Sequence, residues 1–209
     1  MIRLRIAGRL RILVERLRCP RPVAFVFSGG SSLGAVQVGM LRAVLEAEIQ
    51  PDFLVGTSAG ALNAGFIGRG FNAKSVDDLA GIWRELRSED VFPGLGWWSS
   101  LRALAGSGVL ASPAGLERII ERHLPETHAE LTIPTAVIAS DLATGSAVAF
   151  RAGELRRHVL ASAAIPGVFP PVTVDGRSFI DGGVAAHVPL LPARDLGAQT
   201  MVVLDTGFP

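Results

Sequence analysis

A serine within a glycine-flanked pentapeptide is the first candidate for chemistry. Gly56-Thr-Ser-Ala-Gly60 has the spacing G-x-S-x-G and lies between an apolar run, 53–55, and a helical stretch that starts near residue 59. A tight turn from strand to helix raises the serine hydroxyl above the edge of a sheet. Ser58 is therefore the candidate nucleophile, and an ordinary helix cap is the structural alternative.

A glycine-rich turn provides a second candidate. Gly29-Gly-Ser-Ser-Leu-Gly34 also lies between an apolar run and a helical stretch. It lacks both the G-x-G-x-x-G spacing of a dinucleotide site and the Lys-Ser/Thr that ends a P-loop. Backbone N–H groups at such a turn suit a developing oxyanion as well as a phosphate. Next to a candidate nucleophile, we interpret this turn as an oxyanion hole.

A nucleophilic serine needs a base, and two kinds of base are open. Asp181 follows a short strand in Ser178-Phe-Ile-Asp-Gly-Gly183, which delivers a carboxylate into a turn with two glycines, although Asp-Gly is also common in plain turns. A triad in the chain order Ser-Asp-His could instead use Ser58, Asp141 and either His158 or His187.

The three motifs together resemble the patatin-like phospholipase family. The similarity includes 34–41, like the family's first helix, and 161–172, like the block before its aspartate, and it extends from about Val23 to the end. The resemblance implies a dyad in which Ser58 attacks an acyl carbonyl and Asp181 accepts its proton. It also implies that N–H groups around Gly29, Gly30 and Ser31 hold the oxyanion. The motif glycines are Gly34, Gly56, Gly60, Gly182 and Gly183.

The chain departs from the family pattern at three places. Ser31 stands where a third glycine is common, and Leu33 where a basic residue is common. His187 replaces a frequent asparagine, which keeps it as a residue supporting the site. The sequence stops at Pro209, whereas relatives continue, so we expect a fragment or a minimal version of the domain.

Alternating strand and helix patterns predict the elements that position these residues. Strands are expected at 23–27, 53–55, 135–140, 147–151, 172–174 and 201–205, and helices at 34–48, 59–68, 75–88, 113–123 and 154–162. Strands separated by helices predict a three-layer α/β/α fold with a mainly parallel central sheet. The apolar segment 89–112 interrupts this pattern. Its Trp97 and Trp98 are expected either to pack or to anchor at a membrane interface.

Charge divides the chain into two regions. Residues 1–22 carry +6, so the remainder of a chain of net +1 carries −5. Apolar residues of 6–18 lie on one helical face flanked by arginines, which is typical of a helix at a membrane interface or docked on a protein. We therefore predict a basic amphipathic segment, 1–22, and an acyl hydrolase domain, 23–209. An acidic body disfavours nucleic acid, and the single cysteine, Cys19, excludes an internal disulfide.

The expected function is that of a lipid acyl hydrolase, of phospholipase A or lysophospholipase type. The alternatives are a triad carboxylesterase and a catalytically idle membrane or regulatory module. No metal or organic cofactor is expected, because the dyad and oxyanion hole provide nucleophile, base and electrophilic stabilisation. The expected partners are a lipid or phospholipid substrate and an anionic membrane surface. The expected location is cytoplasmic, with peripheral contact at the inner membrane surface.

Overall fold

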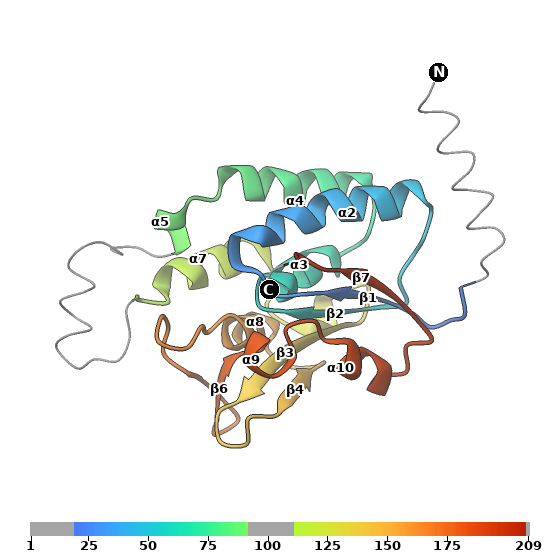
Figure 1. Ribbon diagram of the computed structural model, residues 1–209. Coiled ribbons are helices and arrows are strands. Elements are labelled where there is room, and N and C mark those ends of the chain that lie inside the picture. Colours follow the sequence, from blue (N-terminus) through green and yellow to red (C-terminus); the bar gives the residue numbers. More distant parts are fainter. Residues whose placement is uncertain (1–18, 92–110, 208–209) are drawn as a thin grey trace.

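The computed structural model describes residues 19–91 and 111–207, which are drawn as ribbons in Figure 1. The helix expected over 6–18 and the positions of Trp97 and Trp98 lie outside the described residues. Within the described part, no helix is long and apolar enough to cross a membrane. The division of the chain near residue 22 stays a prediction.

A mixed sheet forms the centre of the described part. Its seven strands are β1 (Val23–Phe27), β2 (Phe53–Thr57), β3 (Thr135–Asp141), β4 (Ala147–Phe150), β5 (Val172–Val174), β6 (Arg177–Asp181) and β7 (Thr200–Leu204). The pairing order is β5-β6-β3-β2-β1-β7, and β4 also pairs with β3. The strands β7, β1, β2 and β3 are parallel, as predicted, whereas β4, β5 and β6 join through antiparallel pairs.

Two strands meet end to end along β3. β4 occupies one edge of β3 from Val137 to Ser140, a span that overlaps the pairings of both β2 and β6. β2 and β6 must therefore share the other edge. Thr57 at the end of β2 pairs with Ile138, and Asp181 at the end of β6 pairs with the next residue, Ala139. The carboxyl ends of β2 and β6 thus face each other across one step of β3.

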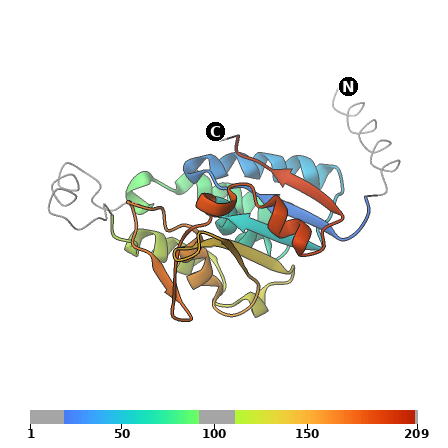
Figure 2. The ribbon, with the colours of Figure 1, turned by 60° about the horizontal axis from the view of Figure 1, so that its bottom comes forward.

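Helices cover both faces of the sheet, which confirms the three-layer α/β/α architecture. One face carries α2 (Gly34–Glu46), α3 (Ala59–Ile67), α4 (Ala73–Glu85), α7 (Ala114–His123) and α8 (Leu155–Ser162); the other carries α9 (Gly183–Ala186) and α10 (Leu190–Asp195). Figure 2 brings α9 and α10 to the front of the sheet. The short helices η1 (Ser31–Leu33), α5 (Ser88–Val91) and η2 (His128–Glu130) complete the described elements.

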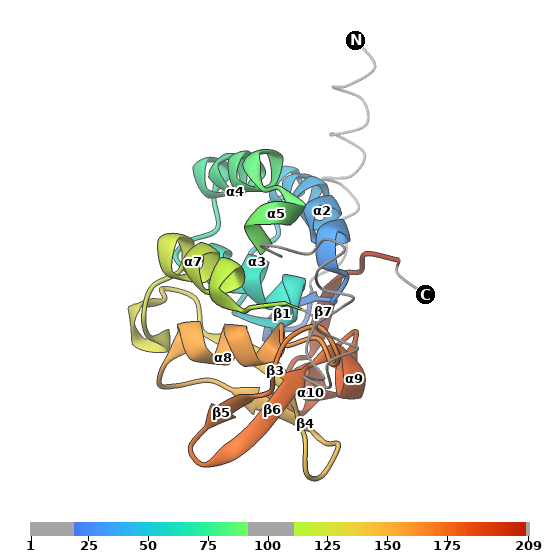
Figure 3. The same cartoon turned by 90° about the vertical axis from the view of Figure 1, so that its left-hand side faces the viewer.

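The sequence of β1 explains why both faces are covered. All five residues of β1 are buried, as is typical of a central parallel strand. Side chains alternate between faces along a strand. Phe25 and Phe27 accordingly pack in the core under α2, α3 and α4, whereas Ala24 and Val26 pack against α10. The parallel strands end together, and Figure 3 looks at this end of the sheet, surrounded by α2, α5, α7 and α9.

Candidate active site

Ser58 lies on a sharp turn between β2 and α3 and has a strained backbone. Its φ of 54° and ψ of −121° are unusual for a residue with a side chain. Such a conformation costs about 1–3 kcal/mol and persists only where the surroundings enforce it. Ser58 is 7% exposed, so its hydroxyl is held in a mostly buried position at the end of the sheet.

The motif glycines allow backbone segments to approach each other closely around this turn. A Cβ on Gly60 would lie 2.4 Å from the carbonyl oxygen of Ser28, and a Cβ on Gly56 would lie 2.4 Å from that of Gly60. A Cβ on Gly182 would lie 2.1 Å from the carbonyl oxygen of Ile138. Real side chains do not fit at these distances. The glycines therefore let α3 and the turn after β6 pack directly on the strands.

Asp181 forms a direct hydrogen bond with Ser58. The Ser58 hydroxyl donates to Asp181 Oδ2 at 2.6 Å, and the Gly183 N–H donates to Oδ1 at 2.7 Å. A Cβ on Gly183 would lie 2.9 Å from the same Oδ1. The end-to-end meeting of β2 and β6 produces this contact, because Ser58 directly follows β2 and Asp181 is the last residue of β6.

Burial raises the pKa of Asp181 above its ordinary value. The hydrogen bonds from Ser58 and Gly183 and the nearby His187 act in the opposite direction, but the loss of solvation is the larger effect. A carboxylate with a raised pKa is a stronger proton acceptor than a solvated one. The Ser58 hydroxyl therefore donates to a buried carboxylate whose affinity for a proton is raised.

Ser162, at the end of α8, supports both residues, and the sequence analysis assigned it no role. Its hydroxyl accepts a hydrogen bond from the Ser58 N–H at 2.8 Å and donates to the Ile138 carbonyl. Its carbonyl accepts from the Gly182 N–H at 3.0 Å, and the Ala164 carbonyl accepts from the Asp181 N–H at 2.8 Å. The block 161–172 therefore holds both the serine turn and the aspartate turn in place.

The glycine-rich loop lies beside Ser58 and is held by hydrogen bonds to His187 and Thr206, which lie near the C-terminus. The Gly29 N–H donates to the His187 carbonyl at 2.9 Å, and the Gly29 carbonyl accepts from the Thr206 hydroxyl at 2.8 Å. Gly30 has a φ of 147°, and a Cβ there would lie 2.5 Å from Thr206 Oγ1. Within the described residues, the N–H groups of Gly30 and Ser31 have no protein acceptor. Of the three predicted oxyanion donors, these two are available.

A buried polar network lies beneath this loop and was missed from the sequence. The Gln37 amide donates to the carbonyls of Ser28 and Leu204, both at 2.9 Å. The Asn63 amide donates to Gln37 Oε1 at 2.8 Å, and the Trp83 indole donates to Asn63 Oδ1 at 2.8 Å. Two fully buried amides among apolar neighbours in α2 and α3 were the available signal. Gly34 is packed against the same indole, where a Cβ would lie 2.8 Å from Trp83.

A largely apolar cavity of about 220 Å³ adjoins Ser58. Ser58 and Ser31 line it together with the apolar side chains of Leu62, Leu116 and Phe169, among others. The cavity therefore offers a low-dielectric space for an apolar group attached to a carbonyl at Ser58. Its volume is smaller than the roughly 300–1,000 Å³ of a typical site for a drug-sized ligand, which favours a single hydrocarbon chain as its occupant.

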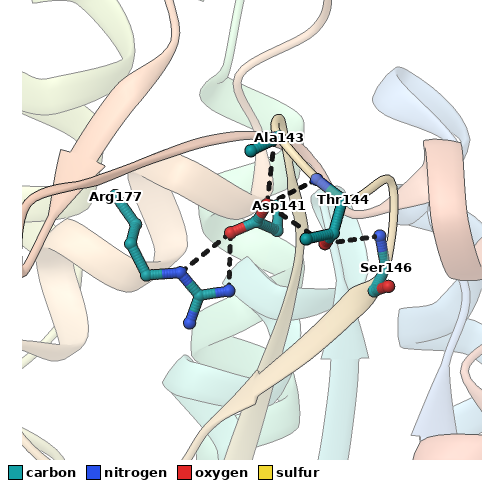
Figure 4. A network of polar contacts seen from close by, with 5 residues as sticks. All are labelled: Asp141, Ala143, Thr144, Ser146 and Arg177. Atoms are coloured by element: carbon teal, nitrogen blue, oxygen red, sulfur yellow. Dashed lines mark hydrogen bonds and ion pairs between the residues drawn. The ribbon is translucent and has the colours of Figure 1, made fainter.

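Asp141 has a structural position, which argues against the triad alternative. Figure 4 shows its carboxylate capping the turn after β3: Oδ1 accepts from the N–H groups of Ala143 and Thr144 at 2.9 and 2.8 Å. Oδ2 accepts two hydrogen bonds from the Arg177 guanidinium, at 2.9 and 2.6 Å. These hydrogen bonds hold the pKa of Asp141 below its ordinary value. None of them involves a histidine.

The two histidines considered for the triad, His158 and His187, lie in different locations. His158 and His128 form a buried pair, with His158 Nδ1 3.1 Å from His128 Nε2, and the His158 ring stacks on Phe150 at 4.1 Å. His187 instead lies between the two glycine turns: a Cβ on Gly29 would lie 3.1 Å from its Nδ1. His187 thus borders the site, whereas the His158 pair makes its contacts elsewhere.

No metal centre accompanies this site in the part of the chain that the structure describes. Among those residues, no group of three or more His, Cys, Asp or Glu side chains could hold an ion. Within the described residues, the polar groups of Ser58 bind other protein groups: its hydroxyl donates to Asp181 and its N–H donates to Ser162.

The described fold is a three-layer α/β protein whose strained serine and buried carboxylate meet at the end of its sheet. The sequence profile of patatin-like phospholipases matches residues 25–194. The chain therefore belongs to the patatin-like phospholipase family. This match confirms the resemblance expected from the three motifs.

Several known proteins are similar to this chain. Patatin-like phospholipase domain-containing protein 7 of Rattus norvegicus is 28% identical over 199 residues, covering 93% of this chain and 14% of the rat protein. An uncharacterized NTE family protein of Mycobacterium tuberculosis is 28% identical over 183 residues, covering 88% and 48%. The crystal structure of VipD from Legionella pneumophila has the same fold, with a TM-score of 0.61 and 15% identity, covering 88% of this chain and 49% of VipD. This chain spans less than half of each of these proteins.

Proposed function

We propose that this chain is a lipid acyl hydrolase that cleaves carboxylic esters through Ser58 and Asp181. One observation carries the proposal: the Ser58 hydroxyl donates to the Asp181 carboxylate at 2.6 Å beside an apolar cavity. Membership of the patatin-like phospholipase family supports a lipid as the substrate. Cleavage of phospholipase A type and of lysophospholipase type would use the same chemical step.

The first half-reaction transfers the acyl group to the enzyme. Ser58 Oγ attacks the carbonyl carbon while its proton passes to Asp181 Oδ2. The N–H groups of Gly30 and Ser31 stabilise the negative charge on the carbonyl oxygen. The tetrahedral intermediate then expels the alcohol, which takes the proton from Asp181, and an acyl ester remains on Ser58.

The second half-reaction releases the fatty acid. Water enters after the alcohol leaves, and Asp181 accepts one of its protons as the oxygen attacks the acyl ester. The second tetrahedral intermediate collapses, Ser58 Oγ recovers the proton from Asp181, and the carboxylic acid departs. The acyl chain occupies the apolar cavity throughout, so hydrophobic burial of the chain helps to position the ester.

Covalent labelling tests this proposal. A fluorophosphonate should form an adduct on Ser58, detected by mass spectrometry of the peptide, and a lipid-ester screen should show hydrolysis. Ser58→Ala should lose the adduct and reduce turnover by several orders of magnitude, up to about 10⁶-fold as in a serine protease. Wild-type turnover in Ser58→Ala would overturn the proposal.

Substitution of the base distinguishes a dyad from a triad. Asp181→Asn keeps the size of the side chain but removes the proton acceptor, so we expect a loss of about 10³-fold or more. His187→Ala should retain at least about a tenth of wild-type turnover, because no step uses its imidazole. Collapse of turnover in His187→Ala at unchanged melting temperature would transfer the role of base to that histidine.

A further inference from the structure

Exposed apolar side chains gather in two stretches of the chain that carry no charged residue. Among the described residues, seven large apolar side chains are exposed, and five of them lie within 28–41 or 182–193: Leu33, Val36, Val184, Leu190 and Leu191. Neither stretch contains Asp, Glu, Lys or Arg, although 19% of the whole chain is charged. These stretches thus expose apolar side chains and lack the charged ones that are common on protein surfaces.

The two stretches meet at His187, beside Ser58. The Gly29 N–H donates to the His187 carbonyl at 2.9 Å. A Cβ on Gly29 would lie 3.1 Å from His187 Nδ1, and a Cβ on Gly183 would lie 3.5 Å from the same atom. The loop after β1 and the turn after β6 therefore pack against one imidazole.

Three exposed apolar residues flank this junction, and we call Leu33, Val36 and Val184 the apolar face. Leu33 follows Gly29 by four residues, and Val36 lies three residues further, which is one helical turn along the start of α2. Val184 directly follows Gly183 in α9. Their exposed fractions are 38%, 48% and 59%. Figure 3 shows α2 and α9 together at this end of the sheet.

The apolar cavity beside Ser58 opens at the apolar face. Three residues that line the cavity are exposed neighbours of Leu33 and Val36 in the sequence: Ser31, Ser32 and Ala35. An acyl chain that enters from a lipid aggregate on this face would pass from one apolar environment into another. A chain that approaches through water would first expose its hydrocarbon surface to solvent, which is unfavourable.

Charged side chains border this face at two points. Exposed Asp205 precedes Thr206, whose Oγ1 would lie 2.5 Å from a Cβ on Gly30. Exposed Arg87 lines the apolar cavity. One negative and one positive group at the border suit a surface whose headgroups carry both charges, as those of zwitterionic lipids do.

We propose that the apolar face docks the protein on a zwitterionic lipid surface and turns the mouth of the apolar cavity toward the hydrocarbon. Exposed apolar patches are typical of contacts with membranes or with other proteins, and the cavity mouth within this patch favours the membrane. The inference rests on the proposed function, because it takes the cavity as the place of an acyl chain. Burial of apolar side chains does not depend on charge, so this contact should persist in salt that screens the arginines of 1–22.

Partition onto phosphatidylcholine vesicles tests the apolar face. The full chain carries Ser58→Ala so that the lipid stays intact, and the salt is about 1 M, where charges are screened beyond about 3 Å. Val36→Ser combined with Val184→Ser should weaken partition by about tenfold or more. Val203→Ser removes a valine that is 42% exposed on the edge strand β7 and should leave partition unchanged. Equal partition of these variants at equal melting temperature, or no binding by the parent chain, would overturn the proposal.

A fluorophore at a single position locates the contact directly. Cys19→Ser removes the one native thiol, so an environment-sensitive dye can be attached to Val184→Cys or, as the control, to Val203→Cys. Phosphatidylcholine vesicles should shift the emission of the dye to the blue at position 184 and leave it unchanged at position 203. Equal shifts at both positions would overturn the proposal. A shift at position 184 that needs no lipid and grows with protein concentration would also overturn it, because a second copy of the chain would then cover the face.

Kinetics with Ser58 intact separate failure of the apolar face from failure of the hydrolase. The double valine variant should lower kcat/KM on phosphatidylcholine vesicles by about tenfold or more and leave kcat/KM on a soluble short-chain ester unchanged, because neither valine lines the cavity. An equal loss on both substrates would overturn the docking role. The expected difference in partition without hydrolysis of either ester would contradict only the proposed function. Hydrolysis of both esters with equal partition would overturn only the apolar face.

Discussion

The Ser162 hydroxyl links the turn that carries Ser58 to the middle of the sheet. It lies 2.8 Å from the Ser58 nitrogen, whose N–H it accepts, and it donates to the carbonyl of Ile138 on β3. Ile138 also pairs with Thr57, the last residue of β2. One buried hydroxyl therefore satisfies two backbone groups at the point where the chain leaves the sheet with a strained φ.

This arrangement predicts that Ser162→Ala impairs both stability and catalysis. The substitution leaves the Ser58 N–H and the Ile138 carbonyl without their partner, which costs about 1–3 kcal/mol for a buried group. The nucleophile turn also loses its anchor, so we expect kcat to fall by about 10-fold or more because small displacements of a reacting group are costly. Chemical denaturation and ester kinetics measure the two effects. Ser146→Ala, at an exposed turn, is the control, and equal behaviour of the two variants would refute the anchoring role.

The raised pKa of Asp181 predicts the acidic limb of the pH–rate profile. Asp181 accepts a proton only in its ionised form, so kcat/KM should fall as the pH drops through its pKa. Because burial raises that pKa, the fall should begin above the ordinary value of 3.8. A profile of kcat/KM with a soluble ester, from pH 4 to 8, provides the measurement. If the remaining activity of Asp181→Asn shows the same acidic limb, another group is responsible for it.

The buried pair His128–His158 predicts a loss of stability in acid. Burial and the neighbouring histidine lower the pKa of His158 from 6.5 to about 4, and burial lowers that of His128. The unfolded chain therefore binds more protons than the folded chain between these values. This contribution to the free energy of unfolding is fully present above about pH 6.5 and is lost as the pH falls toward 4. We expect a loss of about 1–3 kcal/mol from the pair.

Denaturation at several pH values tests this contribution. His158→Gln removes one titrating ring, so the difference in unfolding free energy between pH 7 and pH 5 should be smaller in the variant than in the wild type. His187→Gln is the matched histidine control, since His187 lies in the other location. If the difference in unfolding free energy between pH 7 and pH 5 is the same in His158→Gln as in the wild type, other groups cause the acid sensitivity.

The charge of residues 1–22 predicts a role in binding to anionic membranes. These residues carry +6 and the remainder −5, so the domain without them should be repelled by anionic headgroups. Each basic residue near such a surface contributes about 1 kcal/mol. Removal of residues 1–19 should weaken binding to anionic vesicles and reduce hydrolysis of their lipids, while hydrolysis of a soluble short-chain ester stays near normal.

Raising the salt concentration should reproduce the effect of that deletion, because exposed charges are screened over roughly 8–10 Å. Co-sedimentation with vesicles and the two ester assays supply the comparison. If vesicle binding is unchanged and the melting temperature and both activities fall together, the segment supports the fold and does not bind membranes.

Local sequence determined the elements and the candidate nucleophile. The buried run Val23–Phe27 and the helical period after Gly34 predict β1 and α2, because burial on both faces and a 3.6-residue repeat are local properties. The spacing around Ser58 predicts a strand-to-helix turn for the same reason. Local reasoning left two alternatives for the base, Asp181 and a Ser-Asp-His triad. The resemblance to a known family favoured Asp181.

Only the tertiary structure decided how the site is assembled. Asp181 reaches Ser58 because an antiparallel strand, β6, ends where β2 ends, and strand direction depends on long-range pairing that no local pattern encodes. The role of Ser162 and the use of the Gly29 N–H by His187 likewise join residues distant in sequence. Hydrogen bonds of this kind require two particular backbone groups to meet. They follow from the packing of the layers, whereas the helices and strands themselves follow from the order of the residues.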